Sequence, residues 1–146
     1  MNIARHLALV DELCFRPFPA EHGPSDGGTA GPGYFTAVLE SSRGLRGRAP
    51  GERAATVEQY EKERDALCER LAPRWGGTDP VNLQTVLLRT ERERIPEPWA
   101  GLSADARVAY VWEVAGTGRW VAVAVTDRDE ADEVRLLAVI TREAPP

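Results

Sequence analysis

The sequence is poor in lysine, histidine, cysteine and methionine. Lys62 is the single lysine among 18 basic residues, and there are two histidines, two cysteines and one methionine. Cys14 and Cys68 form no CxxC pair, which argues against a disulfide framework and fits a reducing compartment. Their spacing from His6 and His22 resembles no zinc motif, so we expect core thiols, an ordinary surface histidine and no metal site.

Long apolar runs are also lacking. No stretch approaches the roughly 20 apolar residues that a membrane-spanning helix requires. The N-terminus reads MNIARHLALVDELCF, with Asp11 and Glu12 where a secretory signal would continue its apolar core. The sequence therefore predicts a cytoplasmic protein with no membrane partner.

Recognisable catalytic and cofactor motifs are missing as well. The glycine-rich stretch EHGPSDGGTAGPG has no GxxxxGK[ST] pattern and no strand opening into GxGxxG, and no serine lies in a GxSxG context. We therefore assign no catalytic residue and no cofactor. The enzyme question stays open, because a buried carboxylate such as Glu113 can act alone.

What the chain does contain is enough apolar residue for one core. Its 146 residues are 42% hydrophobic and 28% charged, which is typical of a single folded domain over residues 1–146. The 23 acidic and 18 basic residues give a net charge of -5, which makes a nucleic acid partner unlikely.

Periodicity predicts two helices, from about Ile3 to Phe15 and from Glu52 to about Leu71, with Pro73 ending the second. Stretches rich in glycine and proline predict flexible, irregular loops near 21–33 and 41–51. The segment 34–39 fits either a short helix or a strand. Apolar and β-branched residues predict four strands, with a helix as the alternative over 81–89: Val81 to Leu88, Arg107 to Val114, Arg119 to Thr126 and Val134 to Thr141.

The loop AGTG fixes the register of the best-defined hairpin. If Val114 faces Arg119, Trp112 lies opposite Val121 on one face, and Val111 lies opposite Ala122 on the other. Both faces are apolar, one with large and one with small side chains, so both should be covered. We predict an α+β fold, an antiparallel three- to four-stranded meander packed against two or three helices. The N-terminal segment, a second subunit in a homodimer or another partner would cover the remaining face.

Two features suggest a protein interface. The turn DRDEADE is either a solvated hairpin tip or an acidic patch that binds a basic partner, and it lacks the ligand pattern of a calcium loop. Trp99, in IPEPWAG, is either a plug under the sheet edge or an anchor for a partner. The candidate partner-binding residues are Trp99, Asp127, Asp129, Glu130, Asp132 and Glu133.

The succession RWG, PEPWAG, VWEV, GRWVAVAV and VRLLAVI, over roughly the last 75 residues, resembles small uncharacterised actinobacterial proteins, some of them similar to toxin-immunity proteins. The resemblance implies a cytoplasmic α+β binding protein without a cofactor. We therefore expect a non-enzymatic protein-binding protein, either an immunity-like inhibitor or an adaptor. The alternative is a small-molecule binding domain or weak enzyme with a pocket between helix and sheet.

Overall fold

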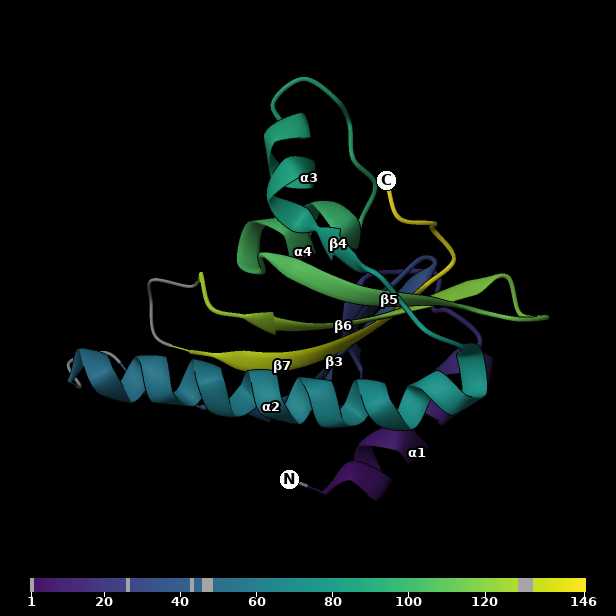
Figure 1. Cartoon of the computed structure of the whole chain (residues 1–146). Helices are drawn as coiled ribbons and strands as arrows, with labels where there is room; N and C mark the ends of the chain where they lie inside the picture. Colours follow the sequence, from purple (N-terminus) through teal and green to yellow (C-terminus); the bar gives the residue numbers. More distant parts are fainter. Residues whose placement is uncertain (1, 26, 43, 46–48, 129–132) are drawn as a thin grey trace.

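The computed structural model describes residues 2–25, 27–42, 44–45, 49–128 and 133–146. An antiparallel sheet lies between two pairs of helices, with α1 and α2 on one face and α3 and α4 on the other (Figure 1). The strand order is β1-β2-β3-β7-β6-β5-β4. In chain order the elements are α1 (Ile3–Phe15), β1 (Gly23–Ser25), β2 (Gly28–Gly31), β3 (Tyr34–Ser41), α2 (Pro50–Trp75), β4 (Pro80–Asn82), α3 (Leu83–Arg89), α4 (Trp99–Asp105), β5 (Val108–Val114), β6 (Arg119–Thr126) and β7 (Arg135–Thr141).

The sheet is larger than the sequence predicted. The described residues form seven strands and four helices, so the expected three- to four-stranded meander with two or three helices is wrong. The additional strands β1 and β2 lie in the glycine-rich stretch expected to be irregular. They form because β2 pairs closely with β3: a Cβ on Gly28 would lie 1.8 Å from the carbonyl oxygen of Thr36. Glycine here permits strand pairing.

The two long helices follow the predicted periodicity. In α1 the side chain of Asn2 accepts a hydrogen bond from the backbone N–H of Arg5, at 3.1 Å, as expected of an N-cap. Helix α2 extends beyond the predicted bounds and contains Pro73, so the prediction that Pro73 ends the helix is wrong. Pro73 lies in the last turn, where the helix continues to its final bond from Gly76 N–H to Ala72 C=O.

For segments 34–39 and 81–89 the sequence allowed either a helix or a strand. Residues 34–39 belong to strand β3. Over 81–89 the structure has the short strand β4 and then helix α3, so the predicted strand from Val81 to Leu88 is wrong. The side-chain oxygen of Asn82 accepts hydrogen bonds from the backbone N–H groups of Gln84 and Thr85, which explains the helix start. In the second expected loop, residues 43 and 46–48 lie outside the described part of the chain.

The predicted hairpin register is confirmed. Val114 pairs with Arg119, Trp112 with Val121, and Val111 with Ala122. The side chains therefore divide into a large-residue face under α1 and α2 and a small-residue face under α3 and α4, and both are covered within the monomer.

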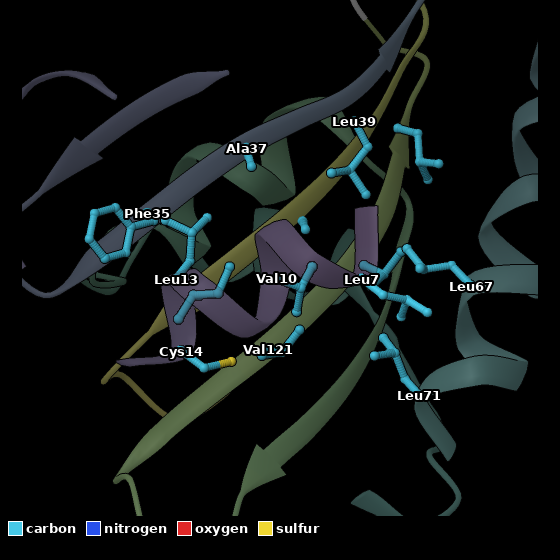
Figure 2. Close-up of a cluster of buried hydrophobic side chains, with 14 of the residues drawn as sticks. Leu7, Val10, Leu13, Cys14, Phe35, Ala37, Leu39, Leu67, Leu71 and Val121 are labelled. Carbon is cyan, nitrogen blue, oxygen red and sulfur yellow. The ribbon is translucent and has the colours of Figure 1, made fainter. Parts of the chain in front are cut away.

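On the large-residue face, Leu7, Val10 and Leu13 of α1 pack with Phe35 of β3 and Val121 of β6, and α2 adds Leu67 and Leu71 (Figure 2). On the small-residue face, alanines of β5 and β6 lie beneath α3 and α4. Members of that second cluster include Leu83, Val86, Ile95, Trp99, Leu102, Ala109, Ala122 and Ala124. In the described chain, no helix combines the length and apolar character needed to cross a membrane.

Candidate functional site

Trp99, the proposed aromatic anchor, lies inside the protein. Its side chain is 0% exposed within the cluster between α4 and the small-residue face, and its indole N–H donates to the carbonyl of Glu143 at 2.9 Å. The sequence left open whether Trp99 is a plug under the sheet edge or an anchor for a partner, and in the structure it is the buried plug. The indole is therefore not a surface anchor in this conformation.

The acidic turn is described only at its two ends. Asp129, Glu130 and Asp132 lie outside the described residues. The backbone N–H of Asp127 donates to the carbonyl of Asp105, the last residue of α4, at 3.2 Å. Trp99 begins the same helix, so the structure connects the two predicted elements to opposite ends of α4. At the other end of the turn, Glu133 accepts a hydrogen bond from Ser41 at 3.3 Å.

Beside α4 lies a small cavity, here called the α4 trench, with a volume of about 190 Å³. Gly101 and Asp105 of α4 lie four residues apart and therefore share one side of the helix, and Glu97, which precedes the helix, completes this wall. Its floor is the part of the small-residue face that belongs to β2, β3 and β7. The sheet residues lining it are Thr29, Tyr34, Thr36, Leu137 and Val139.

The α4 trench is acidic. Its lining contains two carboxylates and three hydroxyl side chains but neither lysine nor arginine. One oxygen of Glu97 accepts from the backbone N–H of Gly101 at 3.0 Å, and the other has no partner among the described residues. Burial raises the pKa of Tyr34, and the nearby charge of Glu97 raises that pKa further. The trench is therefore suited to a cationic group.

Two nearby cations do not line the trench. The guanidinium of Arg128 donates to the carbonyl of Ser103 at 3.0 Å, and the side chain of Arg142 packs beside Gly33 at the β2–β3 turn. The hydroxyl of Tyr34 is hydrogen-bonded to Nδ1 of His22 at 2.9 Å. These contacts hold Tyr34 at one end of the trench and stabilise the turn that follows α4 at the other.

The sequence missed several of these residues. Gly101 and Asp105 are four residues apart, but this spacing indicates a shared surface only once the segment is known to be helical, and Glu97 precedes the helix. Thr29 and Thr36 pair across β2 and β3, which no local pattern could indicate. Glu113, named as an example of a carboxylate that could act alone when buried, is exposed.

The two cysteines and His6 are buried or partly buried. Cys14 is buried and Cys68 is partly buried, and burial raises the pKa of each thiol to about 11. His22 is exposed, as expected of a surface histidine, whereas His6 is 8% exposed and hydrogen-bonded to Glu40 at 3.1 Å. Over the described ranges, no three histidine, cysteine or acidic side chains are grouped so that they could hold a metal ion.

Comparison with protein-family models, with curated proteins and with solved structures gives no match to this chain, so its function has to be inferred from its own geometry.

Proposed function

We propose that this is a non-enzymatic protein-binding protein, an immunity-like inhibitor or an adaptor, which holds a basic segment of its partner in the α4 trench. The observation that carries the proposal is the trench lining of two carboxylates and three hydroxyls without a basic side chain. Asp127, the described start of the acidic turn, is bonded through its backbone to the end of α4, beside this lining. We place the interaction in the cytoplasm.

The dimensions of the trench favour a side chain of a partner over a free ligand. Sites for small molecules and cofactors typically measure about 300–1,000 Å³, whereas the trench measures about 190 Å³. The neighbouring meander offers no further space, since Ala109, Ala122 and Ala124 are at most 1% exposed beneath α3 and α4. A single lysine or arginine side chain fits this description, with its charged end near Glu97.

The overall charge supports the same partner chemistry. The net charge of -5 attracts a basic protein and speeds its association, whereas the geometry of the trench would select the docking position. This division between long-range attraction and local selection gives the proposal a specific test.

The test compares two variants of equal net charge. Glu97→Gln removes the trench carboxylate but keeps an oxygen that can accept from Gly101 N–H, and Glu91→Gln removes an exposed carboxylate in the connection before α4. Binding of a fluorescently labelled arginine-rich peptide is measured by anisotropy at low and high salt. We expect Glu97→Gln to raise Kd about two- to fivefold, the range for a partly exposed ion pair, and Glu91→Gln to leave it unchanged.

Two results would contradict the proposal. Equal weakening in both variants would mean that the peptide responds only to net charge, and no saturable binding by the native protein would exclude a basic segment as the ligand. Gel filtration of the native protein identifies a homodimer, and burial of the α4 trench in that dimer would assign the surface to self-association instead.

A further inference from the structure

A larger groove lies on the opposite side of the sheet, between α1 and the end of β3. Its volume of about 590 Å³ is within the usual range for small-molecule sites. One wall is formed by residues of α1, and the other by Gly27 and by the last residues of β3. The lining residues are Asn2, Arg5, His6, Ala8, Leu9, Glu12, Gly27, Val38, Leu39 and Glu40.

An irregularity in β3 directs Glu40 toward this groove. Val38 pairs with Leu137 of β7, but Glu40 pairs with Leu136, so β3 contains one additional residue at this point. Leu136 belongs to the large-residue face, and residues that pair across strands share a face. Regular alternation would place Glu40 with Val38 on the small-residue face; the bulge turns it to the side where α1 packs. Bulges of this kind often re-aim a side chain next to a functional site.

His6 holds one oxygen of that carboxylate. Its Nε2 lies 3.1 Å from Oε1 of Glu40, while Oε2 has no partner among the described residues. The Glu40 side chain is 31% exposed, so it remains accessible from the groove. From α2, Tyr60 lies near the pair: burial raises its pKa, and the charges of Glu40 and Glu63 raise that pKa further. The imidazole therefore fixes the carboxylate without using all its acceptor capacity.

Arg5 supplies a positive charge to the lining of the same groove. It precedes His6 in α1, it is exposed, and within the described residues its guanidinium has no side-chain partner. At the far end, Glu12 is engaged by Arg16. Between these ends the lining is apolar, with Ala8 and Leu9 from α1 and Leu39 from β3.

We propose that this groove binds a free α-amino acid with an apolar side chain. The α-carboxylate would pair with the guanidinium of Arg5, the α-ammonium with Oε2 of Glu40, and the apolar side chain would lie along Leu9 and Leu39. A carboxylate and an ammonium separated by one carbon match a cation and an anion presented side by side, and paired charges of this kind orient a ligand. The proposal is independent of the α4 trench, which lies on the other face of the sheet.

Isothermal titration calorimetry with L-leucine and L-phenylalanine tests the proposal. We expect saturable binding with Kd of about 1 mM or below. N-acetyl-L-leucine lacks the ammonium and L-leucinamide lacks the carboxylate, and each should bind at least about tenfold more weakly, as expected when a charged partner is left unpaired.

Two variants assign the charges to residues. Glu40→Gln keeps an oxygen for His6 and should reduce the preference for L-leucine over N-acetyl-L-leucine, whereas Arg5→Gln should reduce the preference over L-leucinamide. Glu91→Gln, an exposed carboxylate outside both candidate sites, is the charge-matched control and should bind like the native protein. The proposal is overturned if the native protein binds neither amino acid, if both derivatives bind as well as L-leucine, or if Glu91→Gln weakens binding as much as Glu40→Gln.

Discussion

The two faces of the sheet solve the same packing problem with side chains of different size. On the large-residue face, valine, isoleucine and aromatic side chains contact the long helices α1 and α2. On the small-residue face, the alanines of β5 and β6 contact α3 and α4, which have seven residues each. Small side chains let short helices approach the strands closely, and the bulk needed to fill the space comes from Trp99 above them. The large side chains therefore come from the strands on the large-residue face, and from the helix layer, through Trp99, on the small-residue face.

Each candidate site lies between a helix and strand β3, one on each face of the sheet. The α4 trench opens beside α4, over β2 and β3, and the larger groove lies on the opposite side of the sheet, between α1 and the end of β3. Strand β3 contributes Thr36 to the first and Glu40 to the second, because the bulge after Val38 changes the face to which its side chains point.

Replacing Trp99 should have the largest effect on stability, because it removes the side chain that fills the small-residue face. Trp99→Ala removes the largest fully buried side chain of the small-residue layer, and we expect a loss of about 3–5 kcal/mol in the free energy of unfolding, measured by urea titration. Trp99→Phe loses the hydrogen bond to Glu143 but keeps much of the side-chain volume. We therefore expect it to lower the free energy of unfolding by less than Trp99→Ala does. A loss below about 1 kcal/mol for Trp99→Ala would show that α4 does not depend on this plug.

The cysteines test the burial of the opposite layer. Burial raises the pKa of Cys14 and Cys68 to about 11, so the thiolate fraction at pH 8 should be about 100-fold lower than for thiols with a pKa near 9. Labelling with a thiol reagent should be correspondingly slow until urea is added. Rapid labelling of the native protein would contradict the packing of α1 and α2.

The same pKa shifts predict a pH dependence. A thiol whose pKa is higher in the folded state stabilises that state fully below about pH 9, and this contribution is lost as the pH rises toward 11. The free energy of unfolding should therefore fall over this interval. A variant with Cys14→Ala and Cys68→Ala should show a shallower fall; an equally steep one would assign the effect to other groups.

Overfilling the small-residue face should have an intermediate effect. Ala122 is 1% exposed beneath the helices, so Ala122→Leu adds volume where none is available and should cost about 1–3 kcal/mol of stability. Ala54→Leu, on the exposed side of α2, is the control and should change stability by less than about 0.5 kcal/mol. Equal effects from both variants would mean that the alanine layer is loosely packed.

The smallest effect on stability is expected in the acidic turn. Asp129→Lys with Glu130→Lys should change the free energy of unfolding by less than about 0.5 kcal/mol, because it replaces charges in a connection. The double variant should nevertheless slow the association of the arginine-rich peptide and weaken its salt dependence, as measured by stopped-flow fluorescence. Unchanged association kinetics would restrict the interface to the trench itself.

The candidate sites were only partly predictable from the sequence. Trp99 and Asp127 were predicted to bind a partner, and the structure connects both to α4. Trp99 is buried, however, and the side chains that line the trench beside that helix include Glu97 and Asp105. His6 lies beside the apolar stripe of α1, so its burial follows from helical spacing, but its partner Glu40 is 34 residues away.

The sequence by itself determined the elements whose contacts are local. The helix from Ile3 to Phe15 follows from apolar spacing and an N-cap, and the register of β5 and β6 follows from a short loop and strict alternation. Tertiary structure alone decided the rest. Strands β1 and β2 form only by pairing toward β3, and the bulge that aims Glu40 exists only because β3 pairs with β7, about a hundred residues away. Such contacts join distant parts of the chain and leave no periodic pattern in either part.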